Sequence, residues 1–374
     1  MYSVLDFGRM AADAVRMDAY ARALARAVRP GSVVVDIGAG TGVFSLLAAR
    51  AGAKRVHAID PNPAIFLLPE LARENGVGDR IVIHPTTSFE VELPERADVI
   101  VSDLRGVSPF HADHVAAIRD ARERLLAPGG VLVPLRDRLF VAAVESPGMW
   151  RSLARAWESL EARGLSASAV RTSVLNTLYN DTAAPLAASD VLTTPASWGT
   201  LDYATYDGAV VDATLALPFV RGGTVHGLAL WFEAQVAEGI AYATAPGATL
   251  VYARAFLPLL EPLRVEAGET AKLTLRVDAR GDRWAWETEL SGKRFRQSTF
   301  FGAPTSPDAL LREASTHRPT LSARGDRTRR VLEAMDGRHT VHEIVEAIAT
   351  STPEGALRTA LREEAREAIA RYGS

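Results

Sequence analysis

The chain has 374 residues, 48% hydrophobic and 23% charged, which is ordinary for a globular protein of two or three domains. A formal net charge of −3 excludes a strongly basic surface for nucleic acid, and the lack of cysteine excludes disulfides and thiolate catalysis. The first residues lack the features of a signal peptide, and no apolar stretch reaches membrane-spanning length. We therefore expect a cytoplasmic enzyme or binding protein with no nucleic-acid or membrane partner.

The first 140 residues alternate between the patterns of helices and strands. Apolar residues at helical spacing predict a helix over 10–28, and runs closed by a glycine predict helices at 42–52 and 63–76. Short apolar runs predict strands at 32–38, 55–60, 80–85 and 97–103. The segment 125–134 predicts a helix end, a turn and a further strand. This order is typical of an α/β fold with a Rossmann-like parallel sheet covered on both faces.

The pattern changes after residue 141. A helix is predicted over 150–163, and strand-like segments separated by turn residues follow after residue 183. The clearest strands are predicted at 225–237, 273–279 and 283–290. These segments predict an antiparallel, barrel-like β-domain.

The last part of the sequence returns to helical patterns. Residues 302–310 are typical of a linker, and 327–372 predict helices with a helix–turn–helix arrangement. The tail contains eleven arginines and eleven acidic residues, and this balance argues against DNA binding. We expect a helical segment, a parallel-sheet domain, a β-domain with a helical arm, and a helical extension, with the boundaries 1–28, 29–141, 142–303 and 304–374.

The stretch VVVDIGAGTG, residues 33–42, predicts a ligand-binding turn between a strand and a helix. A phosphate-binding P-loop needs a Gly-Lys-Ser/Thr ending, and a dinucleotide fingerprint needs another glycine one residue after Gly42; both are missing. Asp36 before the turn suits a cationic group, and Asp60 at the end of the next strand suits the hydroxyls of a ribose. Together with Gly38 and Gly40, these residues predict binding of S-adenosylmethionine as the cofactor.

Over most of residues 2–300, the sequence resembles the protein arginine methyltransferases, which have the class I methyltransferase fold. The spacing of Asp13, Arg16 and Tyr20 is similar to that in the N-terminal helix of the family, and the glycine turn and VHGLALWFEAQVAEG resemble further motifs of the family. The resemblance implies that Arg16 binds the carboxylate of S-adenosylmethionine. It also implies a dimerisation arm near 150–182, and hence a homodimer.

The acceptor half of the family pattern is not retained. Asp103 stands where the family has its first substrate-binding glutamate, and the second position falls at Ala112, beside Asp113. Arg105 lies inside the same loop, where a cation should repel a guanidinium. The Thr-His-Trp loop of the family corresponds to the sequence Thr-Leu-Val at 249–251. The resemblance is therefore not sufficient to infer that the substrate is an arginine in a protein.

Several roles remain open for the residues of this loop. Asp103 is predicted to orient the acceptor and is a candidate base. Arg105 either pairs with a substrate carboxylate or forms a salt bridge with Asp103 or Asp113. His111 and His114 are alternative bases or ordinary surface residues. No clear cluster of side chains predicts a metal site.

The prediction for function is an N-methyltransferase that acts on an amine or guanidine of a small molecule or peptide. Ser88 or Glu90 is predicted to lie near the adenine. One alternative is an O-methyltransferase, since both family glutamates are replaced. Another is a cofactor-binding regulatory partner without its own turnover. The tail resembles small modules that bind leader peptides, which points to peptide tailoring, or it is a helical cap on the β-domain.

Overall fold

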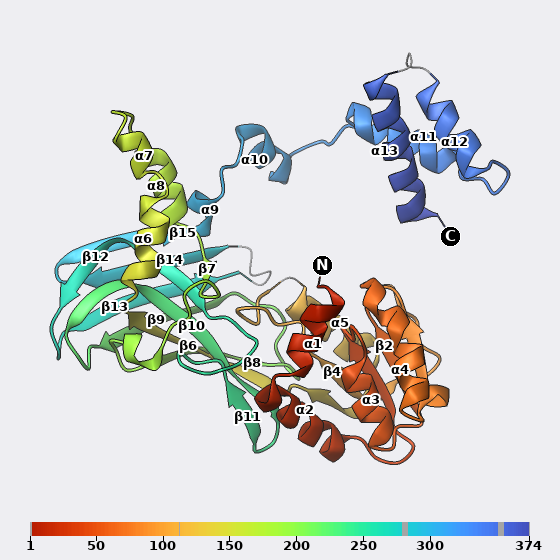
Figure 1. Ribbon diagram of the computed structural model, residues 1–374, viewed down its shortest axis with the longest axis horizontal. Helices are drawn as coiled ribbons and strands as arrows, with labels where there is room; N and C mark the ends of the chain where they lie inside the picture. The colour runs from red at the N-terminus through yellow and green to blue at the C-terminus, as the bar shows by residue number, and fades with distance from the viewer. Residues whose placement is uncertain (1, 112, 279–282, 351–354, 374) are drawn as a thin grey trace. The chain divides into compact units, whose positions relative to one another are not determined.

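The structure is a computed structural model that describes residues 2–111, 113–278, 283–350 and 355–373 (Figure 1). The chain divides into two compact units, Met1–Pro304 and Thr305–Ser374. Among the described residues, no helix has the length and apolar composition needed to cross a membrane.

A parallel sheet of order β3-β2-β1-β4-β5 forms the first half of the first unit. Its strands bury apolar residues between layers of helices, as the short apolar runs predict. The strands are β1 (Val33–Ile37), β2 (Arg55–Ile59), β3 (Ile81–His84), β4 (Ala97–Ser102) and β5 (Leu126–Val133). The helices are α3 (Val43–Arg50), α4 (Leu68–Glu74) and α5 (His114–Arg124), with short 3₁₀ helices at Pro63–Leu67 and Gly78–Arg80. The predicted turn at 125–134 does not interrupt β5 but shifts its register against β4.

The N-terminal segment differs from the single helix predicted over 10–28. It forms two helices, α1 (Val4–Ala11) and α2 (Ala14–Ala27). The break comes from Asp13, whose side chain caps α2 by accepting a hydrogen bond from the Arg16 amide at 3.1 Å. An apolar pattern does not reveal such a cap, so the helical spacing extended the prediction across it.

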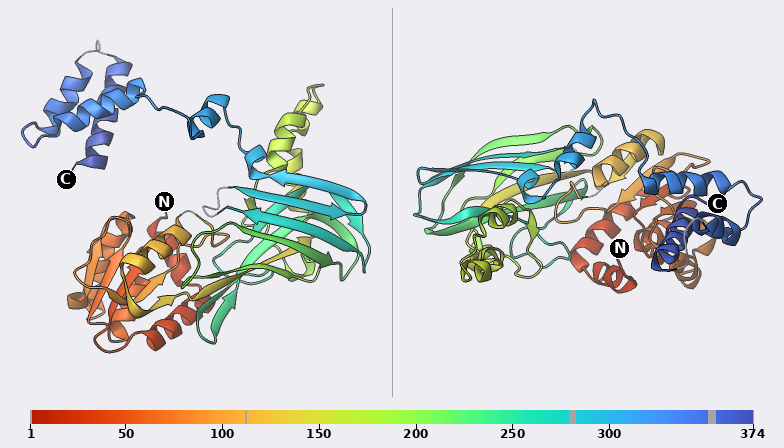
Figure 2. Two further views of the ribbon diagram at one scale, coloured as in Figure 1. Left: turned by 180° about the vertical axis from the view of Figure 1, so that it is seen from behind. Right: turned by 90° about the horizontal axis from the view of Figure 1, so that it is seen from above.

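The second half of the first unit consists of two antiparallel sheets and helices, shown beside the parallel sheet in Figure 2. The order of one sheet is β7-β12-β10-β6-β8, with β11 paired to β10, and that of the other is β15-β14-β13-β9. The strands are β6 (Arg136–Val144), β7 (Tyr179–Asn180), β8 (Ala196–Asp202), β9 (Val211–Pro218), β10 (Gly223–Ala237), β11 (Ile240–Ala243), β12 (Ala255–Val265), β13 (Thr270–Val277), β14 (Trp284–Leu290) and β15 (Lys293–Ser298). The helices are α6 (Pro147–Arg155), α7 (Glu158–Glu161), α8 (Ser168–Leu175) and α9 (Thr299–Gly302), with a 3₁₀ helix at Ala188–Asp190.

One hydrophobic cluster runs through both halves of this unit and joins strands such as β1 and β10. The strands predicted at 225–237, 273–279 and 283–290 are β10, β13 and β14, although residue 279 lies outside the described residues. The predicted α/β fold class with a second, antiparallel domain is therefore confirmed. Because the core is continuous, side chains from both halves meet in fixed positions.

The second unit is helical and has its own small core. Its helices are α10 (Pro307–Glu313), α11 (Ala323–Ala334), α12 (Val341–Ala349) and α13 (Ala356–Tyr372). The linker predicted over 302–310 is wrong in part, because α10 begins inside it. Ser306 caps this helix and Pro307 occupies its first position, two local signals that the turn-rich composition concealed.

Candidate cofactor and acceptor site

A cavity of about 520 Å³ opens at the carboxyl ends of β1, β2 and β4. Its volume is typical of small-molecule sites, and open parallel sheets bind ligands where the strand order turns, as it does at β1. Of the predicted site residues, those that line the cavity are Arg16, Gly38, Asp60, Ser88, Asp103, Arg105 and Asp113. The predicted residues that do not line it are Asp36, Gly40, Gly42 and Glu90.

The glycine turn needs its glycines for backbone shape and close packing. Gly38, Gly40 and Gly42 have φ angles of +76°, +55° and +84°. A Cβ at Gly40 would lie 2.4 Å from the Phe7 ring, and one at Gly42 would lie 2.2 Å from the Leu68 side chain. Two of the three glycines therefore support the cavity from behind rather than form its wall.

Substituting alanine at Gly42 is expected to destabilise the protein more than the same change at Gly76. Both glycines have left-handed backbone, so both substitutions incur a similar backbone cost. Only Gly42→Ala also places a methyl group against the buried Leu68, because nothing lies within 4 Å of a Cβ at Gly76. We expect Gly42→Ala to lower the free energy of unfolding by at least about 1 kcal/mol more than Gly76→Ala, measured by urea denaturation. Equal losses would contradict this packing.

Asp36 is a buried carboxyl group directly before the turn. Its Oδ2 accepts a hydrogen bond from the Ser45 hydroxyl at 2.7 Å, and its Oδ1 has no hydrogen-bond partner among the described residues. Burial raises the pKa of Asp36 to about 7. Among the described residues, no cation forms an ion pair with this group.

The free energy of unfolding of the cofactor-free protein is expected to fall as the pH rises through the range in which Asp36 ionises. In the unfolded chain the Asp36 carboxyl ionises near pH 4, so between pH 4 and 7 the folded state holds the extra proton. The contribution of this group to the free energy of unfolding then decreases as the pH rises. Relative to the natural protein, Asp36→Asn is expected to gain about 1.4 kcal/mol per pH unit between pH 5 and 7, measured by urea denaturation. Asp18→Asn, at an exposed position of α2, is the control, and a flat difference for Asp36→Asn would refute the assignment.

Asp60 stands at the carboxyl end of β2 and is almost fully buried. Its carboxylate accepts hydrogen bonds from the Gly40 and Asn62 amides, both at 2.7 Å. These bonds fix the carboxylate against the glycine turn. Because each oxygen has a further lone pair, Asp60 can still accept hydrogen bonds from hydroxyl groups in the cavity.

The loop after β3 supplies another wall of the cavity through residues 86–89. Ser88, one of the two residues predicted near the adenine, belongs to this wall and is buried. Glu90 is exposed, and its carboxylate accepts a hydrogen bond from the Thr86 hydroxyl. The structure thus brings Ser88, and not Glu90, to the cavity.

Arg16 and Asp103 meet at the cavity from two different elements, α2 and the loop after β4. The Arg16 Nε donates a hydrogen bond to Asp103 Oδ2 at 2.6 Å, and its Nη1 donates to the Met10 carbonyl at 3.2 Å. The guanidinium lies 4.9 Å from the centre of the Phe44 ring. The Tyr252 hydroxyl donates a further hydrogen bond to Asp103. Arg16 is thereby held in place beside the cavity by Asp103, the Met10 carbonyl and the Phe44 ring.

The pKa of Asp103 reflects these neighbours. Burial would raise the pKa, but the charges of Arg16 and Arg105 outweigh burial and lower it to about 2. A carboxylate with so low a pKa is a poor general base near neutral pH. Of the two predicted roles, orienting an acceptor therefore fits Asp103 better than removing its proton.

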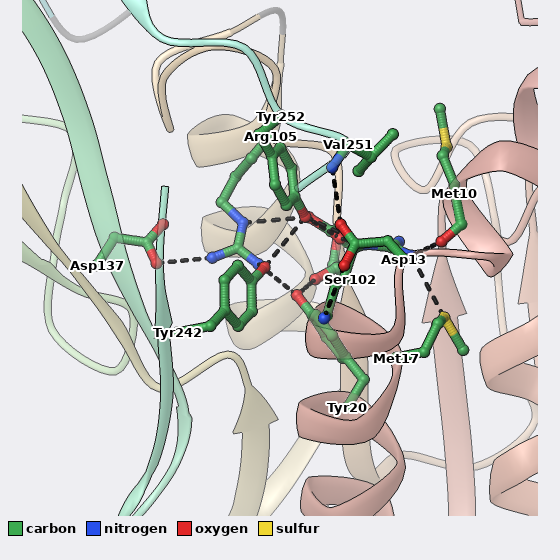
Figure 3. Close-up of polar contacts among 12 residues, drawn as sticks. Met10, Asp13, Met17, Tyr20, Ser102, Arg105, Asp137, Tyr242, Val251 and Tyr252 are labelled. Carbon is green, nitrogen blue, oxygen red and sulfur yellow. Dashed lines mark hydrogen bonds and ion pairs between the residues drawn. The ribbon is translucent and has the colours of Figure 1, made fainter. Parts of the chain in front are cut away.

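Arg105 is fully buried, with none of its side chain exposed. Its Nε donates to Asp103 at 3.1 Å. Its Nη1 donates to Asp137 at 2.7 Å and its Nη2 to the Tyr242 hydroxyl at 2.9 Å (Figure 3). Nη2 also donates to the Tyr20 hydroxyl. These partners come from both halves of the first unit, so Arg105 connects the parallel sheet to the antiparallel sheets.

Of the two roles left open for Arg105, the structure favours the internal salt bridge over the binding of a substrate carboxylate. It has the predicted salt bridge to Asp103, but its second carboxylate partner is Asp137 of β6 and not Asp113. A guanidinium with four internal hydrogen bonds has little capacity left for a substrate carboxylate. The proposal that Arg105 binds a substrate carboxylate is therefore not supported by its geometry.

Of the remaining candidate residues of this loop, two line the cavity and one lies in the hydrophobic core. Asp113 and His111 line the cavity, and the Asp113 carboxylate has no hydrogen-bond or ion-pair partner among the described residues. His114 is buried 2.9 Å from the Tyr203 hydroxyl, and burial lowers its pKa to about 3, so it is a neutral core residue rather than a base at the cavity. Ala112, the predicted second acceptor position, lies outside the described residues.

Four residues of this network were missed by sequence reasoning: Asp137, Tyr203, Tyr242 and Tyr252. The Tyr203 hydroxyl donates to Asp137 at 2.6 Å, and those of Tyr242 and Tyr252 lie 3.1 Å apart. Only Asp137 carries a sequence signal, because its charge occupies an inward position of a strand whose other inward residues, Leu139, Val141 and Ala143, are apolar. The three tyrosines carry no comparable signal.

Comparison with known proteins supports the same fold and cofactor. Residues 14–122 match the family model described as the TRM5/TYW2 methyltransferase domain. Over 232 residues the chain is 28% identical to the probable protein arginine N-methyltransferase 6 of Arabidopsis thaliana, covering 60% of this chain and 53% of that protein. Over 250 residues it is 30% identical to the probable histone-arginine methyltransferase CARM1 of Oryza sativa subsp. indica, covering 64% and 47%. The chain therefore spans about half the length of these curated relatives.

Two solved structures share the fold. One is the Trypanosoma brucei PRMT1 enzyme–prozyme heterotetrameric complex with AdoHcy, with a TM-score of 0.69 at 23% identity, over 78% of this chain and 96% of that chain. The other is Arabidopsis thaliana protein arginine methyltransferase 10, with a TM-score of 0.65 at 21% identity, over 79% and 97%. The chain thus resembles the protein arginine methyltransferases in sequence and has the class I S-adenosylmethionine-dependent methyltransferase fold.

Proposed function

We propose that this chain is an S-adenosylmethionine-dependent N-methyltransferase that acts on an amine or guanidine nitrogen of a peptide, protein or small molecule. The observation that carries the proposal is the meeting of Arg16 and Asp103 at one cavity whose other walls contain Asp60 and Gly38. A cofactor-binding arginine and an acceptor-orienting carboxylate then lie within one hydrogen bond of each other. The names of the curated relatives support arginine nitrogens as one acceptor class.

The chemistry of these residues fits the cofactor. Arg16 is suited to hold the carboxylate of the methionine part, and Asp60 to accept hydrogen bonds from the ribose hydroxyls. Asp36, whose Oδ1 is buried without a partner, is suited to balance the charge of the amino group. When bound, S-adenosylmethionine supplies an activated methyl group on a sulfonium. Holding the acceptor nitrogen in line with that methyl group supplies much of the rate of such a reaction.

The acceptor side of the cavity is assigned to Asp103 and Asp113. Asp103, fixed by its partners, orients the nitrogen, and Asp113, which is exposed and has no partner among the described residues, can accept a hydrogen bond from it. Residues 251–253 and residues 103–107 of the loop after β4 line the same cavity.

We also propose a homodimer formed through the helical segment 147–175. Trp157 and Leu165 are exposed apolar residues beside these helices, and the similar Trypanosoma brucei PRMT1 structure is that of a heterotetrameric complex. Light scattering in solution would show a mass of twice 40.2 kDa. A monomer at micromolar concentration would contradict this part of the proposal.

The proposed function is tested by calorimetric titration with S-adenosylmethionine, followed by incubation with mixtures of amine- and guanidine-containing peptides. We expect saturable binding at one site per chain and release of S-adenosylhomocysteine only when an acceptor is present. Binding without any turnover would instead favour the regulatory partner. Absence of binding would contradict both the methyltransferase and the cofactor-binding regulatory partner.

A further inference from the structure

We infer that Arg105 is a specificity-determining residue that excludes guanidinium acceptors and selects an amine that enters the site uncharged, such as an α-amino group. This inference rests on the proposed N-methyltransferase function and narrows its acceptor class. It follows from three features of the buried network: the capacity of Asp103, the charge balance around Arg105, and the position of Asp113.

The first feature is that the Asp103 carboxylate has little capacity left to accept hydrogen bonds from a substrate guanidinium. Its Oδ1 accepts from Arg105, and its Oδ2 accepts from both Arg16 and Tyr252. Only 3% of the side chain is exposed. A guanidinium recognises a carboxylate through two parallel hydrogen bonds to both oxygens, and here both oxygens already have arginine partners.

The second feature is that the charges of the network already cancel. Two guanidinium groups, Arg16 and Arg105, face two carboxylates, Asp103 and Asp137. Arg105 cannot give way to an incoming cation, because its departure would leave the fully buried Asp137 without its charge partner. The guanidinium of Arg105 also packs 5.1 Å from the centre of the Phe232 ring. Arg105 therefore keeps its place beside Asp103 and Asp137 when an acceptor enters the cavity.

The third feature is the single lining carboxylate without a partner among the described residues, Asp113. Asp60 is bound by the Gly40 and Asn62 amides, and Asp103 is bound as above. One free carboxylate can accept a hydrogen bond from an amine N–H but does not form a pair that clamps a planar guanidinium. An arginine side chain stays charged in proteins, whereas an α-amino group has a reference pKa of about 7.7 to 8.0 and is partly neutral near pH 7.5.

The proposed step balances without a further reactant. The lone pair of the neutral amine nitrogen forms the new N–C bond with the methyl carbon. The C–S bond breaks, and its electron pair remains on sulfur, which becomes a neutral thioether. The methylated nitrogen is then an ammonium, which leaves as such or releases one of its protons to water.

The test compares two peptides that differ only in their nitrogen groups. One has an acetylated N-terminus and a single arginine; the other has a free α-amino group and citrulline in place of the arginine. We expect kcat/KM for the amine peptide to exceed that for the arginine peptide by at least 100-fold, with a rate that rises as the pH approaches 8. Equal or greater efficiency on the arginine peptide would overturn the inference. No turnover with either peptide would overturn the proposed function itself.

Two variants locate the selectivity in Arg105. Arg105→Gln combined with Asp137→Asn removes both charges and keeps hydrogen-bonding side chains of similar size. We expect this variant to reduce the preference for the amine at least tenfold. The matched control, Arg138→Gln with Glu233→Gln, neutralises an exposed ion pair between β6 and β10 and should leave the ratio unchanged. An unchanged ratio in the folded Arg105 variant would contradict the role of Arg105, and the ratio in the natural protein decides the acceptor class even if that variant does not fold.

Discussion

Replacing Arg105 by leucine is expected to lower the free energy of unfolding by about 3 to 5 kcal/mol. The substitution leaves the fully buried Asp137 without its guanidinium partner and deprives Asp103 of one of its two. The hydroxyls of Tyr20 and Tyr242 also lose a donor. Because these partners come from both halves of the first unit, the loss should appear in the main urea-unfolding transition, followed by circular dichroism.

A matched pair of variants distinguishes a buried charge from a lost contact. Arg138→Leu removes an arginine from the exposed pair with Glu233 and is expected to change the free energy of unfolding by less than about 1 kcal/mol. The double variant Arg105→Leu and Asp137→Leu removes both buried charges and should recover most of the stability lost in the single variant. If Arg105→Leu unfolds at the same urea concentration as the natural protein, the Arg105 network does not stabilise the contact between the parallel sheet and the antiparallel sheets.

Replacing Arg16 by glutamine is expected to weaken the binding of S-adenosylmethionine on the order of 100-fold. Arg16 lines the cavity and its guanidinium is suited to the cofactor carboxylate, so a neutral side chain leaves that carboxylate unpaired. The same change removes the 2.6 Å ion pair to Asp103, so turnover should fall with affinity. Isothermal titration calorimetry measures the change in the dissociation constant.

Arg22→Gln is the control for this prediction. Arg22 lies on α2 like Arg16 but is exposed and does not line the cavity. Affinity in this variant should match that of the natural protein. Equal affinity in both variants would mean that the cofactor carboxylate is held elsewhere.

Much of the cofactor half could be predicted because its signals are local. The strand before the glycine turn, the acid at the end of the next strand and the spacing of Arg16 in its helix each lie within one short segment. Asp60, Arg16 and Asp103 accordingly lie at the cavity, at the carboxyl ends of strands or on the helix beside them. Parallel strands bring such positions to one edge, so chain order alone was sufficient.

The acceptor half could not be predicted in the same way, because its contacts join residues far apart in the chain. Arg105 meets Asp137 and Tyr242, and Asp103 meets Tyr252, only after the antiparallel sheets pack on the parallel sheet. The sequence revealed a cation in the acceptor loop but not which carboxylate neutralises it. A charge such as Asp137, at an inward position of a strand whose other inward residues are apolar, indicates that a buried partner of opposite charge is needed.

The measurement that tests the central claim most directly is mass spectrometry of the product formed with S-adenosylmethionine that carries a deuterated methyl group. Peptides with free amines, arginines, hydroxyls and carboxylates would be offered together, and fragmentation would locate the label. The account predicts a labelled methyl group on nitrogen, at an amine before any guanidine. A label on a carboxylate or hydroxyl oxygen, or no label on any peptide despite cofactor binding, would contradict it.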